Sequence, residues 1–119
     1  IYTTNWAYYR IRPDDDAGLE LNFRRTLFTY RKFVGASWSV EAESSLNNIT
    51  GSWRPVTIEI DWNSGLLAVS VDGGSVINTS LHAEAISGFT SGFRLAFHWH
   101  SYSNPGDYQM YRNIKVVQS

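Results

Sequence analysis

Strict alternation of apolar and polar residues is the feature that most constrains what this chain can fold into. Residues 56–62 read VTIEIDW, in which every second residue is apolar and the residues between are polar. Because successive side chains of a β-strand point to opposite faces, this run predicts a strand with one packed face and one wet face. Turn-forming residues follow at 63–65 and alternation resumes over 67–71, so the two runs predict a hairpin.

The same period of two recurs along most of the chain. It is strongest over 93–102, where the apolar set is Phe93, Leu95, Phe97 and Trp99 and the outward set is Arg94, Ala96, His98, His100 and Tyr102. Further strands are expected over 2–11, 19–23, 27–34, 36–42 and 108–116, with another near 76 and at most one helical turn over 81–87. Strands separated by turn residues at roughly 8–12-residue spacings predict an all-β chain, folded as an antiparallel β-sandwich.

Length and composition limit the class of protein. The 119 residues fit one domain, and we expect a single sandwich over residues 1–119. Only 18% of the residues are charged and the net charge is -1, which argues against nucleic acid as a partner. There is no cysteine for a disulfide, and no apolar run approaches the roughly 18 residues of a membrane helix. The chain begins at Ile1 without a signal-like segment, so we expect a processed product or a piece of a longer protein.

Residues 52–117 carry motifs of a known family. The motifs are W-x-x-V-x-I-x-I-D from Trp53 to Asp61, L-x-V-x-V-D-G from Leu67 to Gly73, and the closing YRNIKV of residues 111–116. This stretch resembles the laminin-G-like and other concanavalin-A-like jelly rolls, whose typical members are longer than this chain. The resemblance implies a β-sandwich whose open sheet face binds carbohydrate, with structural calcium at loop positions.

The outward polar residues of the best strands are the candidate binding site. If those strands lie in one sheet, their side chains gather on its open face, where aromatic rings suit the C–H faces of a sugar and polar groups suit its hydroxyls. In the expected last strand, Tyr108, Met110, Arg112, Ile114 and Val116 share one face. Tyr111 lies on the other, outward face. The candidate ligand-binding residues are Glu59, Asp61, Arg94, His98, His100, Tyr102 and Tyr111. A solvated sheet face without a ligand is the alternative.

These residues predict an extracellular glycan-binding or adhesion module, and other functions stay open. The chain is alternatively a structural subunit of a surface fibre, coat or multidomain protein, which self-associates or contacts another protein surface. A carbohydrate-active enzyme is a third interpretation, because residues 59–61 match the start of the E-I-D-x-x-E signature of some glycoside hydrolases. Ser64 stands where that signature needs its general acid, which argues against hydrolysis. A lyase is also open, with His100 or Tyr102 as base and Arg94 neutralising a uronate.

Metal and modification sites complete the expectations. Asp14, Asp15 and Asp16 offer the hard oxygen ligands that Ca²⁺ prefers. Alternate histidines at 98 and 100 have a spacing that suits Zn²⁺ if Glu59, Asp61 or His82 supplies a third ligand. Asn48 and Asn78 begin N-x-[ST] sequons, the acceptor pattern for N-glycans, so we expect a secreted or cell-surface protein.

Overall fold

The computed structural model of the chain describes residues 1–12, 17–35, 37–88, 94–98 and 108–117. The strands are β1 (Tyr2–Thr3), β2 (Trp6–Arg12), β3 (Ala17–Arg24), β4 (Leu27–Val34), β5 (Ser37–Ser45), β6 (Val56–Asp61), β7 (Leu66–Val71), β8 (Gly74–Ser80), β9 (Arg94–His98) and β10 (Gln109–Met110). Helix α1 (Ala83–Gly88) follows β8. Among the described residues there is no helix with the length and apolarity needed to cross a membrane.

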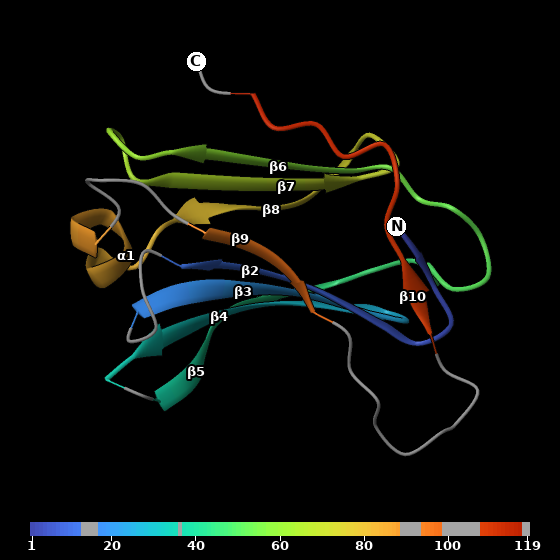
Figure 1. The fold of residues 1–119 in the computed structure, drawn as a ribbon, viewed down its shortest axis with the longest axis horizontal. Coiled ribbons are helices and arrows are strands. Elements are labelled where there is room, and N and C mark those ends of the chain that lie inside the picture. Colours follow the sequence, from blue (N-terminus) through green and yellow to red (C-terminus); the bar gives the residue numbers. More distant parts are fainter. Residues whose placement is uncertain (13–16, 36, 89–93, 99–107, 118–119) are drawn as a thin grey trace.

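Two antiparallel sheets pack face to face. One has the strand order β5-β4-β3-β2-β9 and the other has the order β6-β7-β8, while β1 and β10 form a separate pair. In Figure 1 the three-stranded sheet forms the upper layer and the five-stranded sheet lies beneath it, with α1 at one end. The antiparallel β-sandwich expected from the alternation is therefore confirmed.

The core lies between the sheets and is built from one face of each strand. Leu19, Leu21 and Phe23 of β3 are fully buried, and Leu67 and Val69 of β7 join the same core. Burying a side chain of this size stabilises the fold by about 1.5–3 kcal/mol relative to leaving it in water. Because the residues between them face away from the core, each strand presents a second, outer face.

The hairpin predicted over residues 56–71 forms as expected. Ile58 pairs with Val69 in the β6–β7 register and packs against the core, whereas Thr57, Glu59 and Asp61 are exposed. The period of two in this run therefore reports burial correctly.

The expectation of a last strand over 108–116 is wrong beyond its first residues. Strand β10 is confined to Gln109–Met110, and Asn113 has a φ of 55°, which breaks the extended chain. Ile114 and Val116, expected to face the core, have exposed fractions of 56% and 69%. The apolar residues of this segment alternate without being buried.

Candidate functional site

The outer face of the five-stranded sheet carries a line of paired charges. Arg10 of β2 stands opposite Glu20 of β3, and Glu20 stands opposite Arg31 of β4. Side chains at directly opposed positions of an antiparallel pair lie on the same face, so the register brings these three groups together. Their neighbours along each strand, such as Leu19 and Leu21, belong to the core.

Glu20 is the carboxylate that organises this face. Its side chain is only 1% exposed, and it accepts hydrogen bonds from Nε of Arg10 at 2.8 Å and from Nη1 of Arg31 at 3.2 Å. A buried carboxylate is costly unless it is paired and hydrogen-bonded. Glu20 therefore fixes both guanidinium groups, and the side chains of Arg10 and Arg31 are 21% and 34% exposed.

Trp38 of β5 gathers these cations around one ring. The guanidinium carbons of Arg10, Arg31 and Arg12 lie 4.9, 5.4 and 5.6 Å from its ring centroid. The ring of Phe33, opposite Trp38 in the β4–β5 register, lies 4.7 Å from it. We call Arg10, Arg12, Glu20, Arg31, Phe33 and Trp38 the arginine–tryptophan cluster.

Gly18 makes room for the third arginine of the cluster. A Cβ atom at this position would lie 2.7 Å from Cγ of Arg12 and 2.8 Å from the backbone oxygen of Ile11. Because no real Cβ atom approaches a backbone oxygen so closely, the missing side chain allows Arg12 to cross β3. Its guanidinium then lies 5.4 Å from the ring of Phe33.

A second aromatic group lies on the same face nearer the start of β2. Trp6 donates a hydrogen bond from its indole nitrogen to Oδ1 of Asn22, which is 2% exposed. The guanidinium carbon of Arg24 lies 4.1 Å from the centroid of Trp6, and the ring of Tyr8 lies 5.2 Å away. The outer face thus holds two tryptophans, each in contact with arginine.

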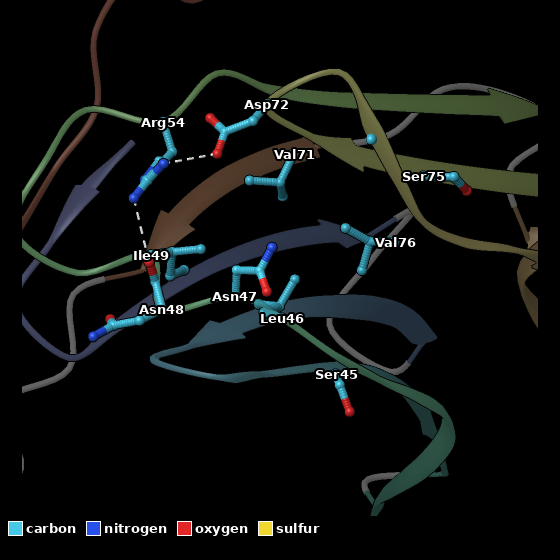
Figure 2. Close-up of a pocket in the computed structure, with 11 residues that line it drawn as sticks. Ser45, Leu46, Asn47, Asn48, Ile49, Arg54, Val71, Asp72, Ser75 and Val76 are labelled. Atoms are coloured by element: carbon cyan, nitrogen blue, oxygen red, sulfur yellow. Dashed lines mark hydrogen bonds and ion pairs between the residues drawn. The ribbon is translucent and has the colours of Figure 1, made fainter.

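A separate hollow of about 300 Å³ lies between the loop after β5 and the β7–β8 hairpin (Figure 2). Arg54 spans its rim, donating to Oδ2 of Asp72 at 2.9 Å and to the backbone oxygen of Asn48 at 3.3 Å. Ile49 and Val71 lie against its apolar side. None of its described lining residues is aromatic, so it lacks the flat platform that a sugar ring favours.

The predicted site does not assemble on one sheet. Glu59 and Asp61 lie on β6 in the three-stranded sheet, whereas Arg94 and His98 lie on β9 in the five-stranded sheet. The expectation failed because alternation fixes the face of a residue within its strand but not the sheet that the strand joins. The β2–β9 register instead places Arg94 opposite Arg12, at the edge of the cluster.

Asp61 supports a turn in this structure. Its Oδ1 accepts hydrogen bonds from the backbone nitrogens of Asn63 and Ser64 at 2.9 and 3.1 Å. A side-chain hydrogen bond from Ser64, together with these backbone bonds, lowers the pKa of the carboxyl below its ordinary value. The carboxylate therefore closes the β6–β7 turn, as Asp commonly does when it bonds to backbone two residues ahead.

Tyr111 is not the outward stacking platform that the sequence suggested. Its ring packs against the core and meets the ring of Tyr9 edge-on, with centroids 5.5 Å apart. Its hydroxyl contacts both the backbone nitrogen and the backbone oxygen of Tyr8 at 3.1 Å, and burial raises its pKa to about 12. The prediction failed with the last strand, since Tyr111 follows β10 and its face cannot be read from a period of two.

Several other predictions fall outside the described residues. These are the calcium ligands Asp14, Asp15 and Asp16 and the site residues His100 and Tyr102. In the part of the chain that the structure describes, no three His, Asp or Glu side chains are grouped to hold a metal ion.

The remaining predicted residues have clear positions. His82, offered as a zinc ligand, is buried in contact with the hydroxyl of Tyr30. Both sequon asparagines, Asn48 and Asn78, are exposed. Asn78 lies opposite Ala68 on β7, one position from the pair of buried Val69 with half-buried Ile77, and so on the outer face of the three-stranded sheet.

The arginine–tryptophan cluster was not predicted from the sequence, although the residues of β2 carry a signal for it. On that strand Trp6, Tyr8, Arg10 and Arg12 alternate with Ala7, Tyr9 and Ile11. This pattern indicates a strand with one aromatic and basic face, which is unusual for a surface that only meets water. The partners Glu20, Arg31 and Trp38 lie on three other strands, so the pairing register was needed to find them.

No family model matches the chain, and no curated protein matches its sequence. A solved structure of a carbohydrate-binding module, CBM66 from Bacillus subtilis, matches with a TM-score of 0.55 and 18% sequence identity. The match covers 65% of this chain and 49% of the other, so the chain spans about half the length of that neighbour. At this identity the likeness shows the β-sandwich fold that the two proteins share.

Proposed function

We propose that this chain is a glycan-binding module and that the arginine–tryptophan cluster is its binding site. The observation that carries the proposal is the half-buried ring of Trp38 on the outer face of the sandwich, with three guanidinium groups around it. A sugar presents apolar C–H faces that pack on an indole and hydroxyl groups that accept hydrogen bonds from arginine. The structural likeness to a carbohydrate-binding module supports the same function.

The cluster is organised before a ligand arrives. Glu20 holds Arg10 and Arg31 in place, and the rings of Phe33 and Trp38 contact each other. Side chains that are already ordered lose less conformational entropy on binding, which improves affinity. The structure therefore favours recognition by a preformed surface.

We further propose that the module is secreted or displayed on a cell surface, where it serves adhesion. Polysaccharides are abundant ligands there, and both sequon asparagines are exposed and so accessible to N-glycosylation. We also propose a concanavalin-A-like relationship, which the motifs of residues 52–117 support.

Binding to a panel of immobilised neutral and acidic polysaccharides, with and without EDTA, tests the glycan-binding function. We expect Trp38→Ala to weaken binding about tenfold or more, because it removes the stacking surface. Trp38→Phe, which keeps a flat ring, should weaken binding less than Trp38→Ala does. Leu66→Ala is the control, since Leu66 is 46% exposed on the other sheet.

The outcomes separate clearly. If Trp38→Ala weakens polysaccharide binding, Leu66→Ala does not, and both variants unfold at the wild-type temperature, the cluster is supported as the binding site. Equal loss with Leu66→Ala would place binding elsewhere. No binding of the wild-type chain to any polysaccharide would reject the glycan-binding function.

Assembly is the second candidate, because β5 is a sheet edge in the described part of the chain. β5 pairs with β4 on one side, and Val40 at this edge is 53% exposed. Exposed edges add strands from other chains. Light scattering after size exclusion tests this: a wild-type oligomer that Val40→Lys converts to a monomer supports assembly, whereas a wild-type monomer rejects it.

A further inference from the structure

We infer that the glycan bound by the arginine–tryptophan cluster is anionic, with a carboxylate or sulfate group on the sugar that contacts Trp38. This inference rests on the proposed function and adds the chemical class of its ligand. It is carried by a surplus of positive charge around the half-buried ring of Trp38, where Glu20 is the one buried carboxylate among the described residues.

Positive charges outnumber negative charges in the arginine–tryptophan cluster. Arg10, Arg12 and Arg31 contribute three positive charges, and Glu20 contributes one negative charge through its two ion pairs. In the described part of the chain, Arg12 makes no ion pair and its Nε is buried without a hydrogen-bond partner. The whole chain has a net charge of -1, so this cationic surface reflects local placement rather than composition.

Among the described residues, the other charged side chains on this face leave the surplus in place. Glu43 of β5 stands opposite Thr29, two residues along β4 from Arg31, and is exposed. Arg24 lies on the same face against Trp6 and offsets that charge. Asp14, Asp15 and Asp16 follow Arg12 in the chain outside the described residues.

The geometry of Arg31 suits an anion. Its described ion pair with Glu20 uses Nη1, and a guanidinium carries five N–H donors in a planar fork. Carboxylate and sulfate oxygens accept two parallel hydrogen bonds from such a fork, and these bonds are roughly twice as strong as neutral ones. Contact with the ring of Trp38 fixes the orientation of the Arg31 guanidinium, which lies beside the surface on which a sugar would stack.

Repulsion among the three guanidinium groups distinguishes the ligand classes. Like charges gathered around one ring raise the energy of the free protein, and the protein interior screens them less than water does. The hydroxyls of a neutral sugar accept hydrogen bonds but leave this repulsion unchanged. An anionic group forms the same hydrogen bonds and also offsets the repulsion.

Matched polymers provide the test, using the whole chain. Polygalacturonate is compared with its methyl ester, and dextran sulfate with dextran, so each pair differs only in its anionic group. We expect the anionic member of at least one pair to bind about tenfold tighter or more, with weaker binding at high salt. The pair that responds identifies carboxylate or sulfate as the recognised group.

Two variants locate the effect. Arg31→Gln and Arg12→Gln should each weaken anionic binding about tenfold, whereas Arg25→Gln should not change it. Arg25 is exposed in the turn after β3, so its loss removes the same charge from a different place. Arg12→Gln leaves both ion pairs of Glu20 intact and therefore tests the idea even if Arg31→Gln fails to fold.

The inference and the proposed function fail in different ways. Equal binding to both members of each pair, or binding only to neutral polysaccharides, overturns the anionic ligand but keeps the glycan-binding module. If Arg25→Gln weakens binding to the anionic polymer as much as Arg31→Gln and Arg12→Gln do, the attraction is nonspecific, and the inference is overturned. The absence of binding to every polysaccharide overturns both.

Discussion

At the scale of single residues, the buried imidazole of His82 links stability to pH. His82 is 4% exposed, its Nδ1 contacts the hydroxyl of Tyr30, and its backbone nitrogen donates to the same hydroxyl at 3.1 Å. Burial lowers the pKa of His82 below 6.5, and this effect outweighs the opposite influence of Glu84 and Glu41. Folding therefore favours the neutral ring, whose Nδ1 forms a hydrogen bond with the hydroxyl of Tyr30.

We expect the free energy of unfolding to decrease as the pH falls below the unfolded pKa of His82. Below that pH the unfolded chain binds a proton at His82 more readily than the folded chain does. The contribution of His82 to the free energy of unfolding is therefore fully present above about pH 6.5 and decreases below it. Urea midpoints at about pH 7.5 and about pH 5.5 measure the change. In His82→Asn, which keeps an acceptor near the hydroxyl but cannot titrate, the change should be smaller. An identical pH dependence in the variant would exclude His82 as its source.

Gly18 illustrates a residue whose missing side chain has a specific use. Adding a methyl group usually stabilises a strand, because glycine loses more backbone entropy on folding. At Gly18 the new Cβ would meet the backbone oxygen of Ile11 at 2.8 Å, so Gly18→Ala should lower stability by about 1–3 kcal/mol. Gly74→Ala is the matched control, since its Cβ meets only an ordinary 3.6 Å contact. Similar urea midpoints for the two variants would contradict this account.

At the scale of elements, the sequence predicted those strands whose alternation matches their burial. The 56–71 hairpin was predicted well because turn residues end β6 and begin β8: Gly65 has a φ of 71°, and Asp72 and Gly73 have φ values of 55° and 78°. The same reasoning failed near the C-terminus, where Ile114 and Val116 alternate with polar residues yet remain exposed. Alternation shows which residues share a face but does not ensure that a partner strand is present.

The candidate site was harder to predict because it depends on pairing between strands. The sequence has Glu20 between the apolar residues Leu19 and Leu21. It gave no indication that Glu20 is 1% exposed, because that burial is produced by arginines from β2 and β4. Likewise, Trp38 and Val40 are two residues apart in the sequence and share one face of β5, but the register with β4 was needed to bring Trp38 beside the arginines.

At the scale of the whole molecule, the sandwich presents two unlike outer faces. The five-stranded sheet exposes arginine and aromatic side chains, whereas β6 of the three-stranded sheet exposes Thr57, Glu59 and Asp61. The core separates the two faces, as Figure 1 shows for the two layers. A ligand on one face therefore leaves the other free for a glycan on Asn78 or for a neighbouring molecule.

This separation gives a test that uses the absence of cysteine in the chain. A cysteine introduced by Thr57→Cys or by Val40→Cys provides a single attachment point, on the three-stranded or the five-stranded sheet respectively. We expect protein tethered through position 57 to retain its polysaccharide-binding capacity. Protein tethered through position 40, which stands opposite Arg31, should lose most of it because the support covers the cluster. Before tethering, both variants should bind like the wild-type chain in solution. Equal capacity in both orientations would show that the ligand does not bind the five-stranded face, whatever the charge of the sugar.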